Sequence, residues 1–190
     1  MNTLSLYEQI QDELEAVEEK LGAIGMESSV AEPSLLMELL GHILEAPGKR
    51  TRPAITILAS KFHPYDHDLP MIMAAAVELL HIATLIHDDM VDNSPTRRGK
   101  ATVSSKWGEN VAVLLGDYVF ATSATIVCDT KNVRVIRRFS ETIMELSSGE
   151  LSEISAAFNW NIPRESYWQR IYDKTASLFS TAAESGAVLS

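Results

Sequence analysis

The sequence predicts an all-α fold, a bundle of helices around a central cavity. Apolar residues recur at spacings of three and four along most of the 190 residues, which is the period of an amphipathic helix. No segment keeps the strict apolar-polar alternation of a half-buried strand. The few prolines fall between the periodic segments or at their starts, where proline is compatible with a helix. Such a chain is long enough to form one domain with a substantial core.

The first predicted helix carries one apolar stripe. The stripe consists of Tyr7, Ile10, Leu14, Val17, Leu21 and Ile24, with charged and amide residues between them. A coiled-coil or dimer element is one interpretation, and a surface helix packed on its own domain is the other. Fewer than four heptads favour the second. We therefore expect residues 1–30 to form an N-terminal helix and loop within a single domain, residues 1–190.

Proline and glycine mark most of the remaining boundaries. Pro33 and Ser34 can begin a second helix that Pro47-Gly48 ends, and Pro53 lies where the first turn of a third helix accepts it. Pro70 opens the long central helix. The further helices expected span residues 33–44, 54–62, 71–92, 110–127, 133–157 and 164 to about 187.

The composition excludes several classes of protein. A net charge of −10 argues against nucleic acid or an anionic membrane surface as the main partner. Cys128 is the only cysteine, so an internal disulfide is impossible and a reducing compartment is expected. The N-terminus is acidic, which predicts no signal peptide. Asp117 interrupts the most apolar stretch, residues 111–127, so we expect no transmembrane segment and a cytoplasmic protein.

An acidic cluster lies at the end of the predicted central helix. Asp88 and Asp92 are four residues apart and share one face, and Asp89 points about 100° away. Carboxylates on a rigid helix suit a hard cation such as Mg²⁺, which commonly combines one or two of them with substrate phosphate oxygens. Arg97 and Arg98 follow and are suited to bind phosphate in a bidentate fork. The alternative is a solvated helix end with a basic loop.

A second group of cations precedes the helix that contains Pro53. Lys49, Arg50 and Arg52 lie at or just before a helix N-terminus, where backbone N–H groups and the macrodipole favour an anion. A basic loop without a ligand is the alternative. His81 lies two turns before Asp88 on roughly the same face, although a lone histidine on an apolar helix is more often a core residue.

Taken together, these motifs resemble the trans-isoprenyl diphosphate synthases, also called polyprenyl synthetases. The matching pieces are Gly48 to Pro53, His81, the sequence from Asp88 to Gly99, Leu115 to Tyr118, Gly149-Glu150 and Lys174-Thr175, in that order. The resemblance covers about residues 35–190. It implies an isoprenoid-synthase-type helical bundle that condenses isopentenyl diphosphate with an allylic prenyl diphosphate, and a homodimer.

The resemblance also assigns residues to roles. Asp88 and Asp92 would hold Mg²⁺, with Asp89 a weaker ligand, while Arg97, Lys174 and Thr175 would contact the allylic diphosphate. The residues implied for isopentenyl diphosphate are Lys49, Arg52, His81 and Arg98. Arg50 has no assigned role, and those of Asp117, Glu150 and Glu153 stay open. Ala83 and Thr84, both small, lie one turn before Asp88, which predicts a product of C20 or longer.

One feature of the family is missing from this sequence. A second aspartate-rich motif, which in the family faces the first, does not occur before Ser190. We therefore expect a fragment of a longer protein, or a short form that needs a partner, with weak or absent activity alone. Two rival functions remain: a non-catalytic partner subunit of a heteromeric synthase, and a terpene cyclase. A calcium-binding loop is excluded because Asn93 stands where that loop needs glycine.

Overall fold

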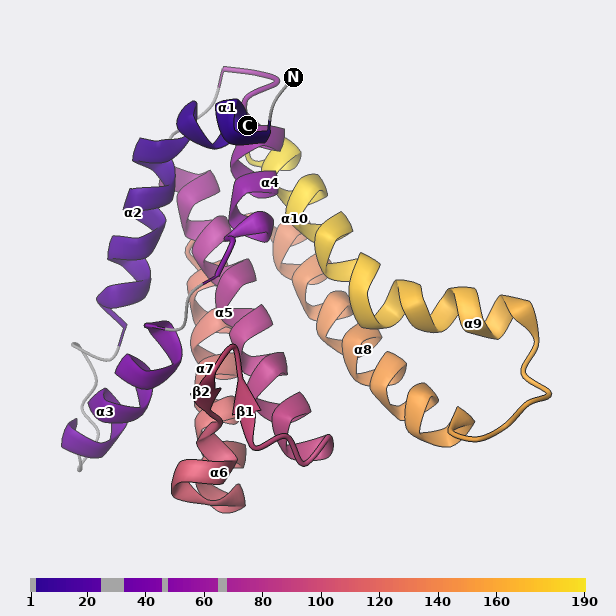
Figure 1. The fold of residues 1–190 in the computed structure, drawn as a ribbon. Coiled ribbons are helices and arrows are strands. Elements are labelled where there is room, and N and C mark those ends of the chain that lie inside the picture. Colours follow the sequence, from indigo (N-terminus) through magenta and orange to yellow (C-terminus); the bar gives the residue numbers. More distant parts are fainter. Residues whose placement is uncertain (1–2, 25–32, 46–47, 65–67) are drawn as a thin grey trace.

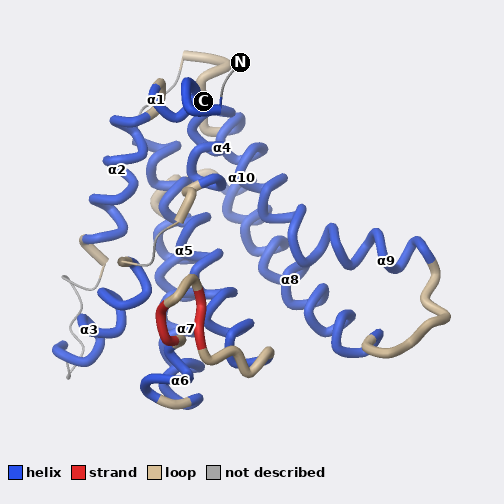
Figure 2. The backbone as a smooth tube through the Cα atoms, in the orientation of Figure 1, coloured by secondary structure: helices blue, strands red, loops and turns tan. Residues whose placement is uncertain are grey.

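The computed structural model describes residues 3–24, 33–45, 48–64 and 68–190 and confirms the all-α fold (Figures 1 and 2). The helices are α1 (Thr3–Glu8), α2 (Gln11–Gly22), α3 (Pro33–Leu44), α4 (Thr51–Ser60), α5 (Asp68–Val91), α6 (Val103–Trp107), α7 (Glu109–Cys128), α8 (Val133–Ala156), α9 (Arg164–Ile171) and α10 (Ser177–Val188), with a π-helical turn, η1 (Tyr172–Ala176). Two short strands, β1 (Thr96–Arg97) and β2 (Lys100–Ala101), pair antiparallel. The loop at residues 63–68 lies partly outside the described residues.

Helix α5 is the centre of the bundle. It contacts α2, α4, α7 and α10 (Figure 1). Its apolar residues occur on nearly every face, so one side joins a core with α2, α4 and α7 while Met73, Val77 and Leu80 join a second core with α8 and α10. A helix buried on several sides is held rigidly, and side chains at its end inherit that rigidity.

The N-terminal stripe is divided between two helices. We expected one helix from Tyr7 to Ile24, but the chain turns between Glu8 and Gln11, where Ile10 has φ −127° and lies fully buried. Val17 and Leu21 of α2 are buried against the core that contains α5. The surface-helix interpretation therefore holds for α2, which packs on its own domain.

The last predicted helix is also divided. Residues 164 to 187 form α9, η1 and α10, and the π-helical turn contains Lys174 and Thr175. Such turns widen the helix by one residue and are often found at functional sites. Gly149 of α8 lies against this turn, since a Cβ there would come within 2.8 Å of the Lys174 backbone nitrogen. Glycine at position 149 thus permits α8 to approach η1.

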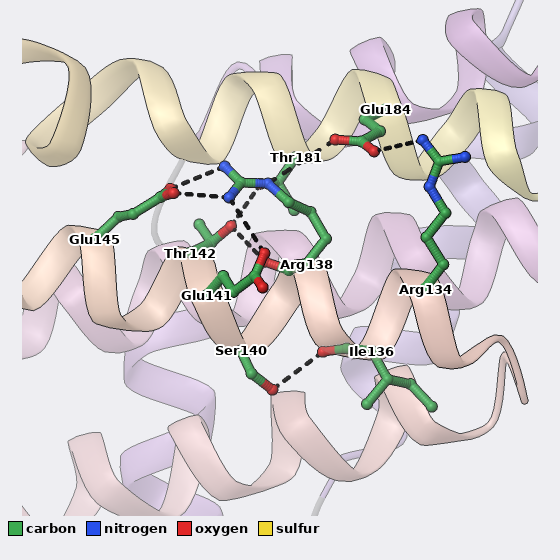
Figure 3. Close-up of polar contacts among 9 residues, drawn as sticks. All are labelled: Arg134, Ile136, Arg138, Ser140, Glu141, Thr142, Glu145, Thr181 and Glu184. Carbon is green, nitrogen blue, oxygen red and sulfur yellow. Dashed lines mark hydrogen bonds and ion pairs between the residues drawn. The ribbon is translucent and has the colours of Figure 1, made fainter.

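Figure 3 shows polar contacts within α8 and between α8 and α10. Arg138 donates to both Glu145 oxygens at 2.7 and 2.8 Å, and the Thr142 and Thr181 hydroxyls hydrogen-bond at 2.5 Å in a buried position. Arg134 and Arg137 of the same helix are exposed, whereas Arg138 is largely covered and ion-paired. The network fixes where α10 leaves η1 and therefore where the turn lies.

Two described helices, α5 and α7, are long and apolar enough to cross a membrane by length and composition alone. The apolar window of α5 is 72% buried inside the protein, as expected of a core helix, whereas that of α7 is 33% buried. Asp117 of α7, whose role the sequence left open, is exposed and its carboxylate lies 3.6 Å from the His87 ring.

Candidate active site

Asp88 and Asp92 lie on one face at the end of α5, as the sequence predicted. The helix ends at Val91, but the Asp92 N–H still donates to the Asp88 carbonyl at 2.8 Å, so the helical spacing continues through both. Burial raises the pKa of Asp88 to about 6, with the nearby charges of Glu150 and Asp92 adding to the rise. A half-buried carboxylate among others favours an added cation.

Lys174 faces this cluster from η1. Its ammonium lies 2.7 Å from Glu150 and 2.5 Å from Glu153, which are one turn apart on α8. Burial alone would lower the pKa of Lys174, but the hydrogen bonds to the two carboxylates outweigh burial and raise it above its usual value. We call Asp88, Asp92, Glu150, Glu153 and Lys174 the acidic wall. Thr175 lies on the same turn and is exposed.

Asp89 and Arg97 bind each other. Asp89 is buried, and Arg97 Nε donates to its carboxylate at 2.8 Å. Asp89, one of the three predicted metal ligands, is therefore ion-paired with a cation of the protein itself. That cation is Arg97, which was predicted to bind the diphosphate. The pair holds the β1–β2 hairpin against α5. Their roles toward metal and diphosphate stay predictions.

The hairpin corrects the expectation that the chain has no strands. Thr96 pairs with Ala101 and Arg97 with Lys100, and the turn between them has Arg98 at φ 51° and Gly99 at φ 81°. Two such φ values are those of the tight hairpin turn that matches the twist of its strands. The turn directs Arg98 toward the loop before α4, where it helps line a pocket.

That pocket has a volume of about 520 Å³ and is predominantly basic. Its lining comes from the loop before α4, from α5 and from the hairpin: Gly48, Lys49, Arg50, Thr51, Arg52, Glu78, His81 and Arg98. All four residues predicted to bind isopentenyl diphosphate therefore line a single cavity. We call it the basic pocket. Local cations collect here although the chain as a whole carries −10.

Arg52 is the most confined cation of the pocket. Its guanidinium lies 4.4 Å from the Phe179 ring centroid, and burial lowers its pKa from the usual arginine value. Within the described part of the chain, its buried Nε has no hydrogen-bond partner. An unpaired buried donor on a guanidinium is costly, and an anion in the pocket would satisfy it.

His81 connects the two regions along α5. It lies seven residues before Asp88, about 10 Å along the helix axis. Burial, together with the positive charges of Arg52 and Arg98, lowers the pKa of His81 to about 3. A neutral imidazole can donate one hydrogen bond without adding another charge to the basic pocket.

Sequence reasoning missed the partners of two cations. Glu78, a lone acid in the apolar run of α5, is buried and accepts from Arg50 at 2.8 Å. Its isolation among apolar residues was the available signal. Glu150 and Glu153 were left without a role because contacts between α8 and η1 cannot be inferred from spacing within one helix.

The acidic wall fits a hard cation only in part. Within the described ranges, no three histidine, cysteine or carboxylate side chains converge on one point as a complete metal site. Mg²⁺ does not require such a cage, because it retains waters and takes substrate phosphate oxygens beside one or two carboxylates. Asp88 and Asp92, with the raised pKa of Asp88, fit that incomplete protein ligand set.

The sequence model for Polyprenyl synthetase matches residues 33–190. The chain belongs to this family. Among curated relatives, it is 36% identical over 189 residues to heptaprenyl diphosphate synthase component 2 of Geobacillus stearothermophilus, covering 99% of this chain and 58% of that protein. Octaprenyl diphosphate synthase of Escherichia coli (strain K12) is 34% identical over 164 residues, 86% of this chain and 51% of that protein.

Solved structures of the family share the fold. A decaprenyl diphosphate synthase from Rhodobacter capsulatus has a TM-score of 0.90 and 36% identity, covering 97% of this chain and 56% of that one. A polyprenyl synthase from Caulobacter crescentus CB15, complexed with calcium and isoprenyl diphosphate, has a TM-score of 0.86 and 34% identity, over 96% of this chain and 55% of that one. The chain thus spans about half the length of the relatives it matches.

Proposed function

We propose that this polyprenyl synthetase chain contributes to condensing isopentenyl diphosphate with an allylic prenyl diphosphate, with Mg²⁺-assisted ionisation. The observation that carries the proposal is the pairing of two opposite sites along α5: the acidic wall at its end and the basic pocket two turns earlier. A reaction between two diphosphates needs two anion sites at such a separation, each with its own means of holding charge. The names of the relatives agree with this class of reaction.

The acidic wall is proposed to bind the allylic diphosphate. Bound Mg²⁺ would supply positive charge for the departing diphosphate, held by Asp88 and Asp92. Lys174 is near enough to Asp88 to lower its pKa, and its ammonium can donate one hydrogen bond to the diphosphate beyond those it gives Glu150 and Glu153. Charge stabilisation aimed at a leaving group acts where negative charge develops, which is the main requirement of this reaction.

The basic pocket is proposed to hold isopentenyl diphosphate without metal. Lys49, Arg52 and Arg98 provide the positive charge, and the neutral His81 provides a hydrogen bond. Arg52 Nε, buried without a described partner, gains one when the diphosphate enters. The apolar residues of α5 beside the basic pocket and between the two sites would help to exclude water that would quench an allylic cation.

The proposed product is C20 or longer. Ala83 and Thr84 present little bulk in the turn before Asp88, and the larger Leu80, Val77 and Met73 lie deeper, all fully buried. The relatives named above make seven- and eight-unit products, which agrees with a long chain. Product analysis of a condensing assembly containing Ala83→Phe tests this: shortened products are expected, and an unchanged product length would contradict it.

The direct test is an assay with labelled isopentenyl diphosphate, a set of allylic primers and Mg²⁺, with EDTA as control. Little condensation is expected from the 190-residue chain alone, because the acidic wall lacks a second carboxylate cluster to complete the metal site among the described residues. Condensation is expected when a polypeptide bearing such a cluster is added. Strong turnover by the chain alone would contradict the partner requirement, and no turnover in either case would contradict the reaction.

A heteromeric partner subunit is the second candidate. The Geobacillus and Bacillus subtilis relatives are both named component 2 of a heptaprenyl diphosphate synthase. In that arrangement a different chain, rather than a second copy in a homodimer, would be required. Size measurement of the purified chain, with and without a candidate second component, separates the proposed homodimer from the heteromer.

A further inference from the structure

The loop that leads into α4 carries much of the basic pocket, and its conformation is unfavourable by itself. Lys49, Arg50 and Arg52 place three positive charges within four residues. Arg50 is also in the left-handed region, with φ 48° and ψ 36°, a conformation that is unfavourable for a residue other than glycine. A loop with these features keeps its shape only if contacts from elsewhere hold it.

Arg50 receives those contacts from two acids. Its Nη1 donates to the buried Glu78 of α5 at 2.8 Å, and its Nε and Nη2 donate to Glu18 of α2. Two carboxylates thus neutralise its charge, and its guanidinium is turned toward the protein. Arg50 is largely covered, with 15% of its side chain exposed. This arrangement suits a structural tie better than a phosphate ligand.

A second tie comes from α1. The Tyr7 hydroxyl donates to the backbone carbonyl of Lys49 at 2.8 Å. Tyr7 and Glu18 belong to helices that precede residue 33, where the match to the family model begins. Both reach the same loop, one at the backbone and one through Arg50. Buried Val17 and Leu21 anchor α2 to the core, so the contact comes from a fixed element.

We propose that Tyr7 and Glu18 are positioning residues that hold the Lys49–Arg52 loop in its diphosphate-binding shape, Glu18 acting through Arg50. The inference rests on the proposed function of the basic pocket. The N-terminal helices then contribute to the binding of isopentenyl diphosphate without contacting it, and Arg50 connects α2, α5 and the loop. The contacts of Tyr7 and Glu18 with the loop thus gain a function, although both residues precede the segment that matches the family model.

The test measures binding of inorganic diphosphate to the 190-residue chain by calorimetry in EDTA. Glu18→Gln and Tyr7→Phe are each expected to weaken binding about three- to fivefold, the value of one ordinary hydrogen bond. Glu19→Gln is the matched control, since it removes the same charge from an exposed neighbour on α2 and is expected to leave binding unchanged or slightly tighter.

The sign of the Glu18→Gln effect is decisive. Removing an acid near a basic pocket strengthens anion binding by simple electrostatics, and it would also free Arg50 if Arg50 were a phosphate ligand. Tighter binding would therefore overturn the proposal, as would no change in both variants. Thermal unfolding should stay cooperative and shift by only about 2–4 °C, the effect of losing one hydrogen bond in a chain of this length. The additional diphosphate binding caused by Mg²⁺ should not change, because only a general loss of structure would weaken the acidic wall as well.

Failure of this inference differs from failure of the proposed function. Arg52→Gln serves as the positive control, since it removes the buried guanidinium of the pocket itself. If the unaltered chain binds no diphosphate in EDTA, the basic pocket and this inference both fall. Suppose instead that the unaltered chain binds diphosphate and that Arg52→Gln weakens this binding. If Tyr7→Phe and Glu18→Gln then bind diphosphate as tightly as Glu19→Gln does, only the positioning role falls.

Discussion

The acidic wall and the basic pocket lie on the same helix yet have opposite needs. The acidic wall has four carboxylates and one ammonium, which contacts only Glu150 and Glu153, and the pKa of Asp88 is raised to about 6. In the basic pocket, the cations outnumber the one acid, Glu78. His81 is neutral above about pH 3, and Arg52 has a buried N–H donor without a partner among the described residues. The first region lacks positive charge and the second lacks negative charge.

Under the proposed function, the difference would let one chain distinguish two substrates that share a diphosphate group. A diphosphate alone is attracted to the basic pocket and repelled by the acidic wall, whereas a diphosphate accompanied by divalent cations has the reverse preference. The separation of roughly 10 Å along α5 is about one Debye length at moderate salt, so each site responds mainly to its own charges.

The largest expected effect follows from removing the carboxylates of the wall. Asp88→Ala or Asp92→Ala should lower kcat of a condensing assembly by about a thousandfold, because charge stabilisation at the leaving group is lost. The measurement is steady-state turnover with saturating substrates. Asp129→Ala, an exposed acid at the end of α7, is the control. A loss expressed only in KM would show that the aspartates serve binding alone.

The next effect is on metal-free anion binding. Arg52→Gln should weaken binding of diphosphate in EDTA by about 10- to 100-fold, since a charge-assisted hydrogen bond and the pairing of Nε are lost together. Calorimetry measures it, with Arg137→Gln on the exposed face of α8 as a matched loss of charge. Equal weakening by both variants would indicate general electrostatics instead of a pocket.

A smaller effect is expected from the carboxylates that hold Lys174. Glu150→Gln should lower the pKa of Lys174 and reduce Mg²⁺-dependent diphosphate binding several-fold, because the ammonium loses a charged partner at 2.7 Å. Binding in EDTA should not change. Tighter Mg²⁺-dependent binding would instead mean that Glu150 competes with the diphosphate for Lys174. Titration with and without Mg²⁺ separates the two regions.

The smallest expected effect is that the protonation of His81 does not change near neutral pH. Because the folded pKa of His81 is about 3, its imidazole should show no titration by NMR between pH 5 and 8 in the free chain. In the unfolded chain this histidine has a pKa near 6.5, so only the unfolded state binds the proton between about pH 3 and 6.5. The contribution of His81 to the free energy of unfolding is therefore full above pH 6.5 and is lost as pH falls toward 3. Diphosphate binding should raise the pKa. A midpoint near 6.5 in the free chain would contradict the burial of His81.

Local sequence patterns predicted most of the fold. Helices α3, α4, α5, α7 and α8 follow the expected ranges within a few residues, because apolar periodicity and proline positions are encoded over short distances. Breaks within helices were missed at Ile10 and at η1, and so was the β1–β2 hairpin. Each depends on contacts with other elements, such as Gly149 against η1, which periodicity does not report.

The sequence by itself determined the chemical groups of this protein: Asp88 and Asp92 on one helical face, two clusters of cations beside them, and a resemblance that named the family. Only the tertiary structure decided which charges remain available. It paired Asp89 with Arg97, Arg50 with Glu18 and Glu78, and Lys174 with Glu150 and Glu153, and it left Arg52 Nε unpaired within the described residues. A side chain's type is local information, but its charge balance is set by neighbours far away in the chain, and folding alone brings these together.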